Sequence, residues 1–275
     1  MRSRPTPLKV HVSADMEGVA GIVDLAQVDP DGGAEYALGR RLMTAEVNAV
    51  IEGAFAAGAD EVVVCDAHWN KRNLLMESLD PRARVVSGGP RPLGMMAGID
   101  ASFAAGIFLG YHASEGHPHG VLAHTWSHLA VDGVRLAGRP AGEGALNAAI
   151  AGHFGVPIAL TIGDRWANDE IEELLGTVDR ADVKEGIGRS AANTLVPARA
   201  VELIRERTRA ALGALHRFRP LELPAPVEIE VRFKQVDGAE RAARSHPGIE
   251  RRDGKTVGYA GADVLDAFRA FAGMF

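Results

Sequence analysis

Three short apolar runs, separated by helical patterns, constrain the fold of this chain more than any other feature. The runs centre on Val12, Val63 and Ile107. Between the first two, apolar residues recur at helical spacing from Leu38 to Phe55, and Gly58 is well placed to end that helix. A strand, a helix and a second strand in this order predict a β-α-β unit. We therefore predict an α/β fold with a mostly parallel core sheet flanked by helices.

A smaller α+β portion is predicted after about residue 195. Residues 197–215 are typical of a helix that begins with a proline, and a proline-rich linker follows at Pro220–Pro226. Val227–Phe233 alternates between apolar and polar residues, as a half-buried strand does, and residues 263–271 have helical spacing. We divide the chain into a metal-binding catalytic α/β domain, residues 8–195, and a C-terminal α+β portion, residues 196–275.

Each apolar run of the first domain ends in side chains that bind metals. Asp15 and Glu17 follow the first run, His68 follows the second, and His112 follows the third. In an extended chain, residues two apart share a face, so both carboxylates point the same way while Gly18 lets the backbone turn. Ligands of open α/β sheets bind outside the carboxyl ends of the strands, so we expect these side chains to converge.

Glu143 joins this set from the predicted start of a helix. It follows a hairpin-like segment at residues 130–134, and its helix is expected to run through Ala151. A mixture of carboxylates and imidazoles suits zinc, or manganese or cobalt as substitutes, better than calcium or magnesium. Five ligands exceed the three of one catalytic zinc, so we predict two ions about 3.5–4 Å apart with Asp15 shared between them. Each histidine taken alone also fits an ordinary residue at a strand end.

These motifs, in this order, resemble the DppA-like D-aminopeptidases, bacterial zinc peptidases named for a dipeptide-permease operon. The resemblance runs from about Val10 to the C-terminus and rests on Ser13–Gly18, Asp66–His68, Leu109–Ala113, Ala123–Thr125 and Gly142–Asn147. It implies an α/β fold and subunits assembled into a ring-shaped decamer. It also implies that His124 is the catalytic histidine and that the ligands of two zinc ions are Asp15, Glu17, His68, His112 and Glu143.

We predict a zinc aminopeptidase that removes the N-terminal residue of short peptides. Two zinc ions activate a water molecule, polarise an amide carbonyl and bind the free amine of a substrate. His124 then assists by proton transfer or by stabilising the oxyanion, although the family treats it as a nucleophile. Asn147 lies one helical turn beyond Glu143 and is expected to bind the substrate or to orient a ligand. His128 is not assigned as a ligand, because residues 125–127 disfavour a helix.

Two alternative functions remain open from the sequence. An amidohydrolase would use the same ligands to cleave other small amides or γ-linked peptides. A non-catalytic ring protein would use them to bind zinc or peptides without turnover. The expected preference for peptides of D-amino acids follows from the resemblance alone, because no residue of these motifs by itself distinguishes D from L side chains.

Composition argues against several other classes of protein. The chain has 275 residues and a net charge of -6, which provides no basic surface for nucleic acid or anionic membranes. The single cysteine, Cys65, excludes an internal disulfide and is expected to be a buried, inert thiol. Neither a signal peptide nor a run of about 18 apolar residues is found, so we expect a cytoplasmic protein. Met1–Pro7 is expected to be loosely ordered.

Overall fold

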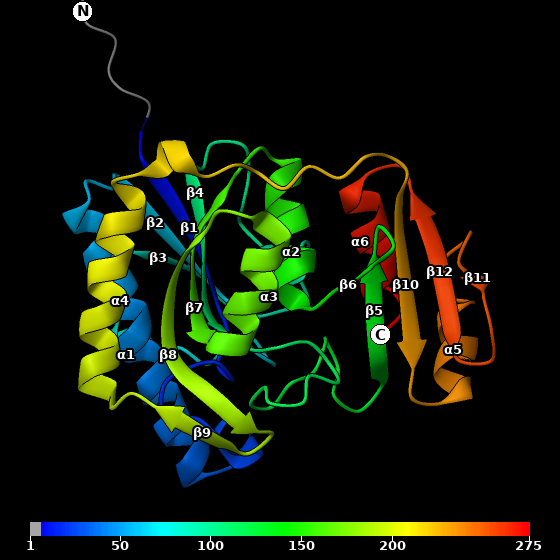
Figure 1. Cartoon of the computed structure of the whole chain (residues 1–275), viewed down its shortest axis with the longest axis horizontal. Helices are drawn as coiled ribbons and strands as arrows, with labels where there is room; N and C mark the ends of the chain where they lie inside the picture. Colours follow the sequence, from blue (N-terminus) through cyan, green and yellow to red (C-terminus); the bar gives the residue numbers. More distant parts are fainter. Residues whose placement is uncertain (1–6) are drawn as a thin grey trace, which may run out of the picture.

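Two sheets organise the chain (Figure 1). The computed structural model describes residues 7–275. The prediction that Met1–Pro7 is loosely ordered therefore concerns a segment that, apart from Pro7, lies outside the described residues. The larger sheet has seven strands in the order β3 (Arg84–Val86), β2 (Glu61–Asp66), β1 (Lys9–Ala14), β4 (Ala105–Tyr111), β7 (Ile158–Asp164), β8 (Asp179–Gly188) and β9 (Ala191–Thr194).

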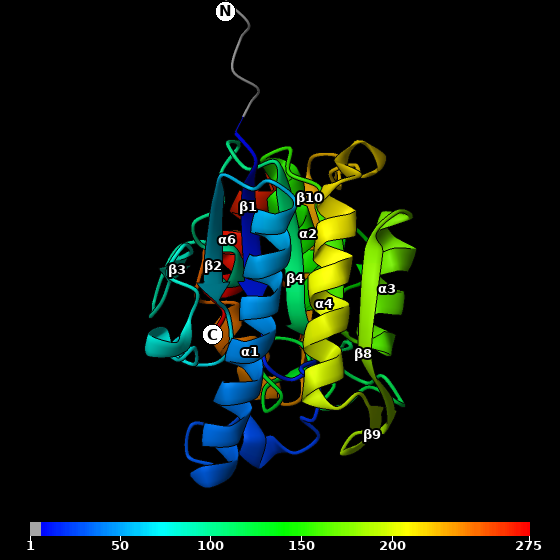
Figure 2. The same cartoon turned by 90° about the vertical axis from the view of Figure 1, so that its left-hand side faces the viewer.

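The seven-stranded sheet is parallel except for the pairing of β8 with β9. Strands β1, β2, β4 and β7 are buried along almost their whole length, as expected of parallel strands covered on both faces. Helices α1 (Ala34–Ala56) and α4 (Pro197–Leu212) pack together on one face (Figure 2). Helices α2 (Glu143–His153) and α3 (Arg165–Leu175) cover the other face. The predicted α/β fold with a mostly parallel sheet is confirmed.

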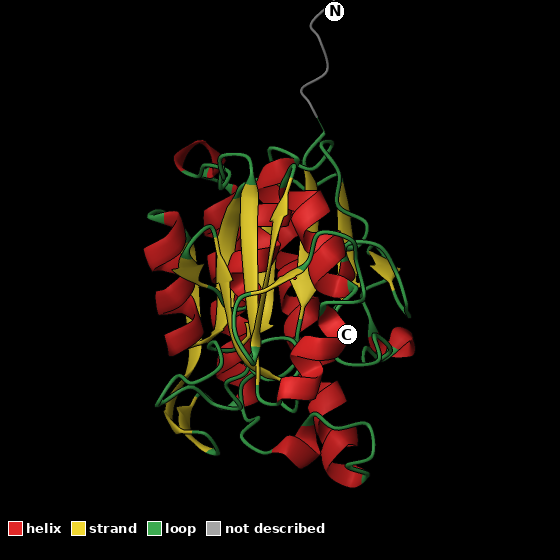
Figure 3. Ribbon diagram, turned by 90° about the vertical axis from the view of Figure 1, so that its right-hand side faces the viewer, coloured by secondary structure: helices red, strands yellow, loops and turns green. Residues whose placement is uncertain are grey.

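The five-stranded sheet is antiparallel, with the order β11 (Glu250–Arg251), β12 (Thr256–Gly261), β10 (Val227–Phe233), β5 (Val131–Leu136) and β6 (Arg139–Pro140). In β10 the apolar side chains are buried and the charged ones between them are not, so one face of this sheet meets solvent. Helices α5 (Val236–Ala242) and α6 (Val264–Ala272) pack on β10 and β12. Figure 3 shows the molecule from the side on which this sheet lies.

The boundary between the sheets differs from the predicted boundary at residue 195. Strands β5 and β6 precede that residue yet belong to the five-stranded sheet, whereas α4 follows it and packs on α1. The hairpin turn also differs: residues 132 and 133 lie inside β5, and the turn is at Ala137 and Gly138, which both have positive φ. Whether residues 8–195 and 196–275 fold as separate units stays a prediction.

Short 3-10 helices occupy Leu25–Gln27, Met76–Ser78, Gly94–Met96 and Leu215–Arg217. Helix α4 ends at Leu212, three residues before its predicted end, and the last of these 3-10 helices begins at residue 215. Among residues 7–275, no helix is both long enough and apolar enough to cross a membrane.

Two glycines bring the backbones after β1 and within β4 into direct contact. The amide of Gly18 donates to the carbonyl of Gly110 over 2.7 Å. A Cβ atom on Gly18 would lie 2.0 Å from the carbonyl oxygen of Tyr111, and one on Gly110 would lie 2.1 Å from that of Asp15. Gly110 also has a φ of +71°, which side chains disfavour. The segment that carries Asp15 and Glu17 can therefore lie directly against the end of β4.

Candidate metal centre

The side chains predicted to bind metal lie together at the carboxyl edge of the seven-stranded sheet. Strands β2, β1 and β4 are neighbours, and His68, the pair Asp15 and Glu17, and His112 follow them in that order. Glu143 reaches the same place from the first turn of α2. All five residues are buried, with exposed fractions between 3% and 6%. The structure thus brings the five residues together, although they are far apart in sequence.

Asp15, Glu17 and His68 form the first half of the cluster. The Nδ1 atom of His68 lies 3.1 Å from Asp15 Oδ1 and 3.0 Å from Glu17 Oε2. The Nε2 atom of the same ring lies 2.8 Å from the carbonyl oxygen of Val28. Because a carbonyl only accepts, we assign the ring proton to Nε2, which leaves the Nδ1 lone pair facing the two carboxylates.

Asp15, His112 and Glu143 form the second half. His112 Nε2 lies 3.4 Å from Asp15 Oδ2 and 3.7 Å from Glu143 Oε1. Its Nδ1 atom lies 3.0 Å from the carbonyl of Ala113, which assigns the proton to Nδ1 and the lone pair to Nε2. Asp15 directs one carboxylate oxygen to each half, as a ligand shared by two ions must. The Trp126 amide donates to Glu143 Oε1 over 2.7 Å and helps to orient this carboxylate.

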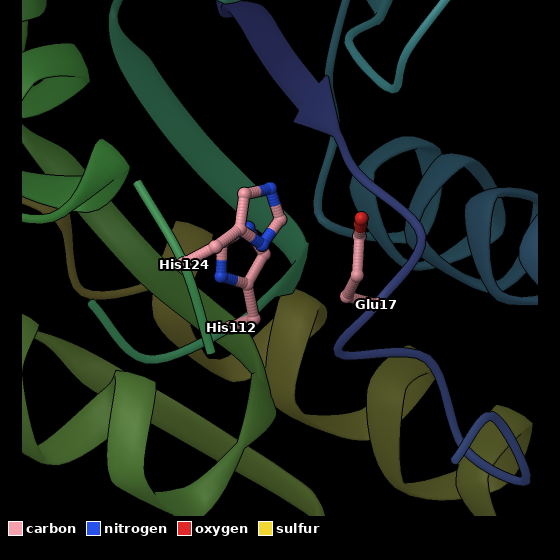
Figure 4. Close-up of side chains that lie close together, drawn as sticks. All are labelled: Glu17, His112 and His124. Carbon is pink, nitrogen blue, oxygen red and sulfur yellow. The ribbon is translucent and has the colours of Figure 1, made fainter. Parts of the chain in front are cut away.

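His124 lies beside the second half of the cluster. Its ring stacks on that of His112 with centroids 4.1 Å apart, and Figure 4 shows both rings across the cluster from Glu17. Its Nδ1 atom lies 2.9 Å from the carbonyl of Leu122, so Nε2 carries the free lone pair, 3.7 Å from Glu143 Oε1. His124 is therefore oriented in the same way as the two histidines already described, with one nitrogen on a carbonyl and the other facing the cluster.

The geometry of the cluster fits divalent metal ions. Two of its buried atoms, Glu17 Oε2 and His112 Nε2, have no hydrogen-bond partner among the described residues. Carboxylate oxygens and imidazole nitrogens are ligands that zinc accepts. Three overlapping triads have ligand atoms within 4.8 Å of one another: Asp15, Glu17 and His68; Asp15, His112 and Glu143; and Glu17, His112 and His124.

The electrostatics of the cluster also call for a cation. Burial, followed by the neighbouring Glu17, raises the pKa of Asp15 from 3.8 to about 6. Burial alone would lower the pKa of His112, but Glu143 and Glu17 raise it to about 9. Without a metal, a second proton on the imidazoles, at the nitrogens whose lone pairs face the cluster, would balance the buried carboxylates, and a divalent ion would supply the same positive charge. Burial and then His112 lower the pKa of His124, which favours its neutral form.

A cavity of about 410 Å³ opens over the cluster. Four non-glycine residues of its lining, Trp69, Lys71, Leu122 and Trp126, have positive φ values between 41° and 65°. Such strained backbone is rare and concentrates at functional sites. Sequence reasoning did not identify these lining residues. The available signals were the position of Trp69 next to His68 and of Trp126 two residues after His124.

Asn147 is not among the residues that line the cavity, and its predicted role in binding the substrate or orienting a ligand stays a prediction. Its buried side chain donates to the hydroxyl of Tyr111 over 2.8 Å, because one helical turn from Glu143 places it against β4. His128 does line the cavity, with its ring 6.1 Å from that of His124, but it belongs to none of the three triads. Cys65 is buried, and burial raises the pKa of its thiol to about 11, as expected of an inert thiol.

Sequence reasoning also missed the residues that hold the segment carrying Asp15 and Glu17. The Nζ atom of Lys184, a buried residue of β8, donates to the backbone carbonyls of Glu17, Val19 and Ile22. Glu46 of α1 accepts a hydrogen bond from the amide of Ala20 over 2.9 Å. No local pattern marks either residue, because both act on a segment that is distant in sequence.

Comparisons with known proteins agree with this geometry. The family model of the D-aminopeptidases, peptidase family M55, matches residues 8–273. A D-aminopeptidase of Bacillus subtilis (strain 168) is 39% identical over 267 residues, which cover 96% of this chain and 95% of the relative. The solved structure of the zinc-dependent D-aminopeptidase DppA from Bacillus subtilis, described as a self-compartmentalizing protease, is 38% identical. It superimposes with a TM-score of 0.93 over 97% of this chain and 96% of the other.

Proposed function

The chain belongs to the D-aminopeptidase family, and from this membership we propose the residues and steps by which it cleaves peptides. It is a zinc-dependent aminopeptidase, and the observation that carries our assignment is the convergence of five buried ligand side chains in one cluster beneath a cavity. Asp15, Glu17 and His68 would hold one ion, and Asp15, His112 and Glu143 the other. When bound, zinc supplies Lewis acidity, which activates water and polarises the carbonyl of a peptide bond.

His124 would move protons during the reaction. Its Nε2 lone pair faces the cluster, and its lowered pKa keeps the ring neutral and able to accept a proton near pH 7. The bond from its Nδ1 atom to Leu122 fixes the ring in this orientation. An acid–base role fits this environment better than a nucleophilic role, because activated water is the more direct nucleophile. Asn147 would act only indirectly, through Tyr111.

Zinc content and peptide hydrolysis, measured together, test this proposal. We expect the purified enzyme to bind two zinc ions per subunit and to cleave D-Ala-D-Ala faster than L-Ala-L-Ala. Asp15→Ala should lose both the metal and the activity, since it removes the ligand shared by both ions. His124→Ala should retain zinc and lose turnover. Bound zinc without cleavage of either peptide, but with cleavage of γ-glutamyl amides, would favour the amidohydrolase. Unchanged activity in His124→Ala would contradict the proposed proton transfer.

We further propose that the subunits assemble into a ring-shaped decamer in the cytoplasm. The description of the Bacillus subtilis structure as a self-compartmentalizing protease supports an oligomeric assembly. Sedimentation of the purified protein tests it, and a monomer of 29.1 kDa would refute it. Fractionation of cells that produce the protein tests its location.

A further inference from the structure

Two cationic side chains line the cavity in addition to the cluster, and both are available to a ligand. They are Lys71 and Arg189, and neither forms an ion pair within residues 7–275. Most other arginines that line pockets of this protein have carboxylate partners, as Arg180 has in Asp169, Glu172 and Asp182. A cation without a carboxylate partner at a binding cavity is suited to an anionic group of the substrate.

Arg189 is held in place at the wall of the cavity. It lies in the turn between β8 and β9, where its carbonyl accepts a hydrogen bond from the Leu122 amide over 2.9 Å. Its Nη1 atom donates to the carbonyl of Ala123 over 2.8 Å. A guanidinium carries five N–H donors, so this single bond leaves most of the group free. The side chain is thus both oriented and largely unsatisfied.

The position of Arg189 relates it directly to His124. Ala123, which the guanidinium contacts, is the residue next to His124 in the chain. Arg189 thus lines the cavity beside His124, where the part of a short peptide beyond the scissile bond, about 3.3–3.6 Å per extended residue, would extend. Lys71 lies three residues after His68, on the segment that follows β2, and its Nζ atom is bound to the carbonyl of Ala67.

We propose that Arg189 binds the C-terminal carboxylate of the substrate, so that the enzyme favours dipeptides with a free carboxylate one residue beyond the scissile bond. This inference rests on the proposed function. The zinc cluster would take the amino end of the dipeptide, and the planar guanidinium would take the carboxylate through two parallel hydrogen bonds. The substrate class is then a small zwitterion rather than a longer or blocked peptide, which agrees with a cavity of about 410 Å³.

The test compares D-Ala-D-Ala with its C-terminal amide, which has no negative charge. We expect the zinc-loaded wild type to prefer the free acid in kcat/KM by about tenfold to a hundredfold, as for a charge-assisted pair. Arg189→Gln keeps a donor for the Ala123 carbonyl but removes the charge. In this variant kcat/KM for the free acid should fall by that tenfold to hundredfold factor, mainly through a higher KM. The value of kcat/KM for the amide should change little. Arg189→Lys should retain part of the preference for the free acid, because lysine keeps the positive charge but cannot donate the two parallel hydrogen bonds of a guanidinium.

Lys71→Gln is the matched control, since it removes the other unpaired cation of the cavity. We expect it to keep the wild-type ratio of acid to amide. A ratio that disappears in Lys71→Gln but persists in Arg189→Gln would overturn the proposal. Equal losses on acid and amide in Arg189→Gln would also overturn it, because they would indicate a structural role. Cleavage of the amide reports on the zinc centre alone, so failure of the proposed function is recognised separately.

Discussion

The two sheets of this protein differ in how their strands are buried, and the reactive groups follow that difference. The parallel strands β1, β2 and β4 are covered on both faces, and their carboxyl ends carry the cluster of candidate metal ligands. The antiparallel strand β10 is covered on one face, and its other face carries Glu228, Glu230 and Arg232. No residue of β10 or β12 lines the cavity over the cluster. The comparison indicates that the first sheet builds the site, whereas the second mainly contributes stability.

Lys184→Met should have the largest effect, because it affects the first sheet and the site together. It leaves the carbonyls of Glu17, Val19 and Ile22 without their buried donor, at about 1–3 kcal/mol each, so we expect a loss of roughly 3–9 kcal/mol. Urea denaturation of the zinc-free protein measures this loss. Zinc affinity should fall by about tenfold to a hundredfold, as when an orienting partner of a ligand is removed.

The control for that variant is Lys9→Met. Lys9 forms a surface ion pair with Glu61 over 3.4 Å, and such pairs contribute up to about 1 kcal/mol. Equal losses of stability in the two variants would show that the three carbonyls find other donors, such as water.

Ile229→Ala should separate stability from activity. Ile229 is buried in β10, and truncation of a buried isoleucine costs about 2–5 kcal/mol in unfolding free energy. The zinc content and kcat of the folded fraction should stay as in the wild type, because β10 contributes nothing to the cluster. Loss of bound zinc in protein that is still folded would break the proposed division between the two sheets.

The stability of the first sheet should depend on pH through Glu46. Burial raises the pKa of this carboxyl from 4.5 to about 7, with the Ala20 amide and Lys184 acting in the opposite direction. Because the pKa of Glu46 is higher in the folded than in the unfolded state, its contribution to the free energy of unfolding is fully present below pH 4.5. That contribution is lost as pH rises through 7, because the folded state must then ionise a buried carboxyl. Relative to the wild type, Glu46→Gln should gain about 3 kcal/mol between pH 4.5 and 8, because each pKa unit corresponds to about 1.36 kcal/mol. Parallel stability curves for the two proteins would contradict this expectation.

The smallest effect is expected on the outer face of the second sheet. Glu228→Thr removes an exposed ion pair with Arg252 and places a β-branched residue in a strand. We expect the unfolding free energy to change by no more than about 0.5 kcal/mol. A loss above about 2 kcal/mol would show that this face is covered in solution, for example by another subunit. Comparison of dilute and concentrated protein would reveal such a contact.

The convergence of the five candidate ligands was predictable because each one follows a strand or begins a helix. In a parallel sheet these positions meet at one edge, so local patterns were enough to bring Asp15, His68 and His112 together. The residues that support them were not predictable in this way. Lys184 and Arg189 act on segments more than 60 residues away, and only the packed structure shows those partners.

Features that the sequence did not reveal also have physical causes. Helical periodicity placed Asn147 near Glu143, but it did not reveal that its side chain donates to Tyr111 of β4 and to Met95. The segment Asp132-Gly133 has the composition of a tight turn, yet pairing with β10 keeps it extended. The same pairing carries β5 and β6 into the second sheet, which a linear division of the chain cannot anticipate.

The close contact at Gly18 and Gly110 has a consequence for how such an enzyme evolves. A methyl group on either residue would collide with backbone, so neither glycine can be replaced without moving the segment that carries Asp15 and Glu17. The rim is free of this restriction, since Leu25, Trp69 and Leu129 are 39%, 46% and 77% exposed. New substrate preferences can therefore arise by mutation at the rim, while the reaction itself is inherited unchanged.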